Sequence, residues 1–247
     1  MTGGSIVTFY SYKGGVGRSF ALANVAVILA RWHFKVLCID WDIEAPGLSY
    51  YFAPYMADSA RGLGLVDMLA EFADTPNSGL PWRSYATTIS LPGVAFIDLI
   101  SAGRRDDTYT GRVQSLNWSS LYGQGLGSAL EQMCLEFRDA YDFILIDGRT
   151  GVTDFGGIIT AQLPDVLAFL FTANEQSLEG AAEIAERAVR LRNDLPFDRP
   201  RLLLLPVPAR FEANVDTRPR STGKAVMSTG SAVSTDRGQS RIHRCDR

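Results

Sequence analysis

The sequence predicts a doubly wound α/β fold, with a mostly parallel sheet and helices on both of its faces. Apolar runs alternate along the chain with segments of helical periodicity, which is the order of elements in such folds. Several apolar runs are continuous rather than alternating, as strands are when both faces of a sheet are covered. A chain of 247 residues, 46% of them hydrophobic, is long enough to bury one sizeable core. We expect strands at 6–11, 35–40, 94–100, 143–147, 166–171 and 202–205, and helices at 19–32, 65–72, 127–137 and 177–192.

The first strand and the first helix flank a glycine-rich loop. Residues 13–19 read Lys-Gly-Gly-Val-Gly-Arg-Ser, and an apolar segment follows at 20–30. Strand, glycine-rich loop and helix form the context that a phosphate-binding loop requires. Glycines let backbone N–H groups approach an anion, and the helix N-terminus adds its dipole. We therefore expect a nucleotide to be bound by Gly14, Gly15, Val16, Gly17, Arg18, Ser19 and Phe20.

The second strand ends among carboxylates. Asp40, Asp42 and Glu44 follow one another at its end, before a turn at Pro46-Gly47. A carboxylate at the carboxyl end of a strand can hold a water in line with the γ-phosphate of a nucleotide. The alternative is a strand that simply ends in a polar turn. Beside a phosphate-binding loop, the functional interpretation is favoured.

Two middle segments carry weaker signals. Residues 56–93 hold a short helix and a loop rich in Pro, Gly and Asn, which we interpret as an insertion or a lid. Residues 103–125 carry Tyr109, Trp118 and Tyr122 among charges and glycines. We expect this second segment to be a surface connection, with a face that a partner could contact.

The strand at 143–147 is apolar and ends in Asp147, which predicts a carboxylate that holds magnesium through water. The residues after it, 148–154, contain two glycines that would permit a switch to change conformation. Further on, Ser177 is a natural N-cap for the next helix. After the last strand, residues 206–210 could line a base pocket, and Pro208 is the candidate contact there.

The loop departs from the usual phosphate-binding pattern in a specific way. Tyr12 takes the position of the first glycine, Arg18 takes the position of the lysine, and Lys13 opens the loop instead. This arrangement resembles the deviant phosphate loop of the ParA/MinD family of ATPases, in the variant that reads KGGVGR. The resemblance covers about residues 5–210, with sharp motifs at the loop, after the second strand and at Asp147.

The resemblance implies roles for individual residues. Lys13 would act in catalysis by reaching across a dimer to the partner's nucleotide, and Asp42 would position the attacking water. Ser19 would ligate Mg²⁺, with Asp40 and Asp147 supporting the metal. Glu44 stays an alternative base. Arg18 keeps a permanent charge and a forked donor for phosphate, but it is longer and flatter than lysine.

The implied activity is a slow, partner-stimulated ATPase that forms an ATP-dependent homodimer around two nucleotides and controls an unknown partner protein. A second hypothesis is a nucleotide-binding interaction module with little or no turnover. A third is a DNA-partition factor. Residues 1–212 carry 17 basic and 24 acidic residues, a balance of −7, so nucleic-acid binding is not supported by this part of the chain.

Composition excludes several other classes of protein. The three cysteines, Cys38, Cys134 and Cys245, match no disulfide or metal pattern, and two histidines are too few for a zinc site or a triad. We expect no signal peptide and no membrane-spanning segment, and hence a cytoplasmic protein. We divide the chain into an ATPase domain at 1–212 and a Ser/Thr/Arg-rich tail at 213–247, which we expect to be disordered. A truncated or frame-shifted end and a functional basic tail are the two explanations of that tail.

Overall fold

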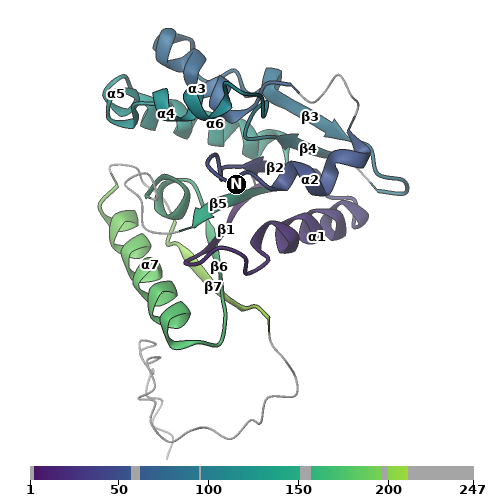
Figure 1. Cartoon of the computed structure of the whole chain (residues 1–247), viewed down its shortest axis with the longest axis vertical. Helices are drawn as coiled ribbons and strands as arrows, with labels where there is room; N and C mark the ends of the chain where they lie inside the picture. The colour runs from purple at the N-terminus through teal and green to yellow at the C-terminus, as the bar shows by residue number, and fades with distance from the viewer. Residues whose placement is uncertain (1–2, 57–61, 95, 151–156, 196–199, 211–247) are drawn as a thin grey trace, which may run out of the picture. The chain divides into compact units, whose positions relative to one another are not determined.

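The computed structural model describes residues 3–56, 62–94, 96–150, 157–195 and 200–210. Within them, one sheet has the strand order β3-β4-β2-β5-β1-β6-β7 (Figure 1). Neighbouring strands are parallel except for the antiparallel pair β3 and β4 at one edge. The strands are β1 (Ser5–Ser11), β2 (Val36–Asp40), β3 (Ala86–Ile89), β4 (Ile97–Ile100), β5 (Phe143–Thr150), β6 (Val166–Phe171) and β7 (Leu203–Pro208).

Helices cover both faces of this sheet, which confirms the predicted fold class. Along β2, Val36 and Cys38 pack with α1 and α2, whereas Leu37 and Ile39 pack with α3 and α6 on the opposite face. Figure 1 shows α1 apart from the group α3 to α6 across the sheet. The alternation follows from the period of two in a strand, which lets continuous apolar runs fill two cores. The helices are α1 (Arg18–Arg31), α2 (Leu48–Phe52), α3 (Leu65–Asp74), α4 (Tyr109–Ser115), α5 (Trp118–Gly123), α6 (Leu126–Ala140) and α7 (Glu175–Asn193), with short turns η1 (Ala53–Tyr55), η3 (Pro76–Ser78), η4 (Trp82–Tyr85) and η5 (Ile158–Gln162).

The segment at 56–93, which we expected to be an insertion or a lid, builds part of the core instead. Helix α3 buries Leu65, Met68 and Phe72, and Trp82 is buried as well. The segment also supplies the edge strand β3, which the sequence did not predict. Its four residues, Ala-Thr-Thr-Ile, carry too little apolar character to be recognised as a strand without their neighbour β4.

The segment at 103–125 is not a surface connection, so that expectation is wrong. It forms α4 and α5, and both Tyr109 and Trp118 are buried in the core, whereas Tyr122 is 41% exposed. The hydroxyl of Tyr109 donates a 2.8 Å hydrogen bond to the carbonyl of Ile43. This bond ties α4 to the residues that follow β2.

The other predicted strands and helices are present with small shifts in their bounds. The six predicted strands are present, although the third of them, observed as β4, starts at Ile97 and the last extends to Pro208. Helix α7 begins earlier than predicted, because Asn174 rather than Ser177 is its N-cap. In the part of the chain that the structure describes, no helix has the length and apolar character needed to cross a membrane. The tail at 213–247 and the switch residues 151–154 lie outside the described residues.

Candidate nucleotide-binding site

The loop between β1 and α1 has the backbone of an anion cradle. Gly15 has φ 73° and Gly17 has φ 89°, both in the left-handed region that glycine adopts at little cost. Gly17 caps α1, so the helix N-terminus with its free N–H groups opens onto the loop. A Cβ on Gly14 or Gly17 would meet no other atom within 4 Å, which leaves space above the loop. A cavity of about 380 Å³ lies there, lined by Ser11, Gly14, Gly15, Val16, Gly17, Arg18, Ser19, Phe20, Asp42, Ala45 and Tyr51.

The start of the loop is anchored on α7. The ring of Tyr12 packs against Gly180, where an added Cβ would lie only 2.4 Å from the ring. The ammonium of Lys13 donates a hydrogen bond to the side-chain oxygen of Gln176 in the first turn of the same helix. Tyr12 stands where the usual motif has a glycine. Its bulk therefore gives this loop a second support besides β1 and α1.

Three carboxylates gather at the carboxyl ends of β2 and β5. The two strands are neighbours, and Asp40 is in register with Asp147. Both side chains are fully buried, and Oδ1 of Asp40 and Oδ2 of Asp147 have no hydrogen-bond partner. Burial, with a contribution from the charge of Asp147, raises the pKa of Asp40 to about 8. Oδ2 of Asp40 accepts a 3.0 Å hydrogen bond from the backbone N–H of Leu48.

Arg18 joins two of these carboxylates. Its Nε donates to Oδ1 of Asp147 at 2.5 Å, and its Nη2 donates to Oδ2 of Asp42 at 2.6 Å. Arg18 is only 7% exposed. Burial opposes its charge, but the attraction of Asp147 and Asp42 outweighs it and raises the pKa of the Arg18 guanidinium. Burial also raises the pKa of Asp147, although Arg18 acts against that rise.

The structure thus brings together the loop, Asp40, Asp42 and Asp147, which the sequence singled out separately. The side chain of Arg18 pairs with Asp42 and Asp147, which the sequence did not predict. The assignments of Arg18 to phosphate, of Asp42 to the attacking water and of Lys13 to a partner's nucleotide stay predictions.

The oxygen atoms at this edge suit Mg²⁺. The partnerless oxygens of Asp40 and Asp147 are hard donors, and the hydroxyl of Ser19 lies near enough to Asp147 to lower its pKa by hydrogen bonding. No group of three or more His, Cys, Asp or Glu in the described part of the chain is arranged to hold a metal ion. Mg²⁺ uses one or two protein carboxylates together with substrate phosphates and water, and Asp40 and Asp147 could supply those carboxylates.

The chain is similar to known proteins in sequence and in fold. The chain is 30% identical over 163 residues to the chromosome-partitioning ATPase Soj of Treponema pallidum, covering 64% of this chain and 54% of that protein. Its fold matches a plasmid partition protein from Borrelia burgdorferi with a TM-score of 0.61 and 19% identity, over 86% of this chain and 81% of that chain. The chain is thus similar in sequence and in fold to ParA/MinD-type P-loop proteins. No protein-family profile matches the sequence.

Three further proteins are similar to this chain in sequence or in fold. An uncharacterised ATP-binding protein of Methanocaldococcus jannaschii is 25% identical over 187 residues, covering 74% of this chain and 59% of that protein. EpsB of Ralstonia nicotianae, a candidate tyrosine-protein kinase, is 29% identical over 194 residues but is covered over only 22% of its length. MinD in the MinC:MinD complex of Aquifex aeolicus gives a TM-score of 0.56 at 16% identity, over 84% of this chain and 69% of that one. The chain spans between a fifth and three fifths of its curated relatives.

Two residues near the glycine-rich loop, Tyr51 and Arg210, were not predicted from the sequence. Tyr51 lines the cavity and faces Phe20, with 6.0 Å between ring centroids. The end of the Arg210 side chain lies 3.8 Å from the place of a Cβ on Gly15. Neither has a local signal, because Tyr51 arrives with the short helix α2 and Arg210 with the end of β7. Pro208 is exposed at the end of β7 and does not line the cavity, so its contact with the base stays a prediction.

A glycine after Asp147 has a packing role. A Cβ on Gly148 would lie 2.9 Å from the carbonyl oxygen of Phe9 and 3.0 Å from the side chain of Ile159. Gly148 therefore lets β5 approach β1 where the register of the two strands shifts. The second glycine of the expected switch, Gly151, lies outside the described residues.

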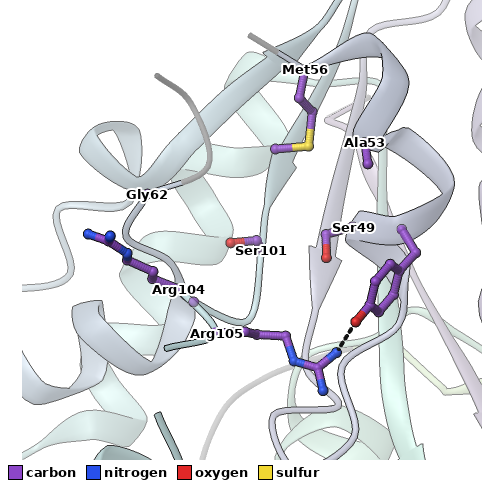
Figure 2. Close-up of a pocket in the computed structure, with 9 residues that line it drawn as sticks. Ser49, Ala53, Met56, Gly62, Ser101, Arg104 and Arg105 are labelled. Atoms are coloured by element: carbon purple, nitrogen blue, oxygen red, sulfur yellow. Dashed lines mark hydrogen bonds between the residues drawn. The ribbon is translucent and has the colours of Figure 1, made fainter. Parts of the chain in front are cut away.

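A second cavity of about 240 Å³ lies between α2 and the residues that follow β4 (Figure 2). Nη1 of Arg105 donates to the hydroxyl of Tyr50 at 2.7 Å and to the carbonyl of Pro46 at 3.4 Å. The segment from Asp42 to Leu48 is therefore held from outside the loop as well as by Arg18. The cavity is lined by Ser49, Tyr50, Ala53, Met56, Gly62, Ser101, Gly103, Arg104 and Arg105.

Proposed function

We propose that this chain binds ATP together with Mg²⁺ and hydrolyses it slowly, as a switch that acts on a partner protein. One observation carries the proposal. The glycine-rich loop and Asp42 line the same cavity, and Arg18, which also lines it, pairs with the buried Asp147. A cradle for phosphate and carboxylates for a water and a metal thus meet at one edge of the sheet. A candidate plasmid partition protein from Borrelia burgdorferi that has the same fold was solved bound to AMPPNP, at 20% identity and a TM-score of 0.61.

The loop residues would bind and orient the nucleotide. Backbone N–H groups from Gly14 to Ser19 face the phosphates, and the N-terminus of α1 favours their negative charge. Ser19, Asp40 and Asp147 would hold Mg²⁺, which neutralises charge on the phosphate oxygens. Asp42 would orient the attacking water and take up its proton.

Dimerisation would couple this chemistry to a partner. In the family that the loop resembles, the early lysine reaches the nucleotide of the other subunit. Lys13 is at the surface of this chain, where Gln176 holds it. To act across a dimer, Lys13 has to leave Gln176, so the monomer and the dimer would differ at the first turn of α7. Loops that are held by the γ-phosphate relax when it leaves, which would reset the partner interface.

A second candidate function is a nucleotide-binding interaction module with little turnover. The pairing of Asp42 with Arg18 favours it, because a carboxylate oxygen that accepts from an arginine is occupied and does not hold a water. A role in DNA partition would match the names of several relatives. The acidic balance of residues 1–212 speaks against DNA binding by this part of the chain alone.

The two candidates differ in a single-turnover experiment with labelled ATP and excess protein. The switch predicts that ATP binds and that ADP and phosphate form at a measurable rate. The interaction module predicts binding without product. Equilibrium dialysis on the same sample measures binding directly. Failure of the folded protein to bind ATP–Mg²⁺ at millimolar nucleotide would contradict both candidates.

A further inference from the structure

We propose that Arg18 is a positioning residue with two alternative sets of partners. It holds Asp42 and Asp147 while the loop is empty, and it moves to the nucleotide phosphates when ATP binds, which frees Asp42 to orient water. The inference rests on the proposed binding of ATP. It goes beyond that proposal, because it makes the activation of Asp42 a consequence of nucleotide binding rather than a fixed property of the site.

The geometry of the pairing is the first argument. The guanidinium spans two carboxylates that come from different segments, 24 and 129 residues away in the sequence. Nε faces Asp147 and Nη2 faces Asp42, so a single planar group fixes the distance between the two acids. A lysine ammonium is a compact point charge and offers no such fork. The arginine of the KGGVGR loop is therefore suited to holding both carboxylates at once.

The position of Arg18 in the chain is the second argument. It is the first residue of α1, and its backbone belongs to the loop that would face phosphate. Its side chain lines the cavity together with Asp42 and the glycines. We expect rotation about its side-chain bonds to carry the guanidinium from the carboxylates to a phosphate in that cavity. The helix does not need to move.

The buried charges decide when Arg18 can move from the carboxylates to the phosphates. If Arg18 leaves, Asp42 and Asp147 stay buried without their partner, and such isolated charges are costly. Arg18 can therefore leave only when another cation takes over Asp147 and when phosphate offers Arg18 a new anion. Nucleotide phosphate and a divalent cation should thus release Asp42 together. Either one alone should leave Arg18 on the carboxylates.

The direct test is the NMR signal of the Arg18 Nε–H group in protein labelled with ¹⁵N-arginine. The signal is assigned by its loss in Arg18→Lys. In the empty protein it should shift on Asp147→Asn, because Asp147 is its acceptor. Asp106→Asn is the matched control: it removes one carboxylate charge beside a different arginine, Arg112, and should leave the Arg18 signal in place.

The decisive comparison adds AMPPNP with Mg²⁺. We expect the Arg18 signal to move and to become insensitive to Asp147→Asn. AMPPNP without Mg²⁺, in EDTA, should leave the signal at its empty position. An Arg18 signal that stays on Asp147 while dialysis shows bound AMPPNP–Mg²⁺ would overturn the exchange and leave the proposed function standing. Absence of AMPPNP binding would overturn both.

Discussion

At the scale of single residues, Asp42 is the group on which hydrolysis should depend. We expect Asp42→Ala to slow single-turnover hydrolysis by about a hundredfold or more, because it removes the carboxylate that orients water. ATP binding should persist, since the phosphate contacts belong to the loop. Glu44→Ala is the comparison variant. If Asp42→Ala keeps the parent rate and Glu44→Ala loses it, Glu44 is the base.

Arg18 should matter for stability even without nucleotide. Arg18→Ala leaves Asp42 and Asp147 buried and unpaired, which should lower the free energy of unfolding by roughly 3–5 kcal/mol. The control is Arg190→Ala, which breaks the exposed pair with Glu186 and should cost about 0.5 kcal/mol or less. Urea unfolding of both variants checks this. Equal losses in the two would mean that the buried pairing contributes nothing special.

Asp40 should make stability depend on pH. Its pKa is about 8 in the folded protein, whereas an aspartate in an unfolded chain titrates near about 4. Between these values the folded state keeps a proton that the unfolded state releases, so stability should fall as pH rises from about 4 to about 8. The raised pKa of Asp147 acts in the same direction. Asp40→Asn, measured in EDTA by urea unfolding across this range, should flatten the slope; an unchanged slope would contradict the assignment to Asp40.

The sequence contained the signals for the residues of the site but not for their pairing. Gly15, Gly17, Asp42 and Asp147 were recognisable because each lies at or after the predicted carboxyl end of a strand, where ligands of α/β proteins bind. The partners of Arg18 depend on which strands are neighbours, and the order β2-β5-β1 is a tertiary property. Tyr51 reaches the cavity only because α2 packs against α1.

At the scale of elements, the contact between the loop and α7 should be specific. Gly180→Ala would place a methyl group about 2.4 Å from the ring of Tyr12, so the ring or the helix has to move. We expect lower stability and weaker ATP binding, because Tyr12 begins the loop. Tyr12→Gly in the same chain should restore much of the binding, since the added methyl then has room. Thermal unfolding and equilibrium dialysis of the single and double variants measure both effects.

Element prediction failed where an element depends on its neighbour. The strands with continuous apolar runs and the long amphipathic helices were predicted correctly, because their patterns are local. The edge strand β3 and helices α4 and α5 were missed. Their residues are mixed in polarity, and Tyr109 and Trp118 are buried only because α3 and α6 lie beside them. Aromatic residues among charges were taken for a surface when they form core.

At the scale of the whole molecule, the nucleotide loop is held by side-chain contacts in two places. Inside the chain, Arg18 holds Asp42 and Gln176 holds Lys13. Binding of ATP–Mg²⁺ should draw Arg18 away from Asp42, and dimerisation should draw Lys13 away from Gln176. We therefore expect ATP both to bind at the loop and to change the oligomeric state of the chain.

The most direct measurement is multi-angle light scattering of Asp42→Ala with ATP–Mg²⁺ and with ADP–Mg²⁺, beside the double variant Lys13→Ala/Asp42→Ala. The mass should double from 27.0 kDa with ATP only, because hydrolysis is blocked and the ATP-bound state accumulates. The double variant should bind ATP and stay monomeric, since it lacks the group that reaches the second nucleotide. A monomer with bound ATP in Asp42→Ala, or a dimer that forms without Lys13, would contradict the account.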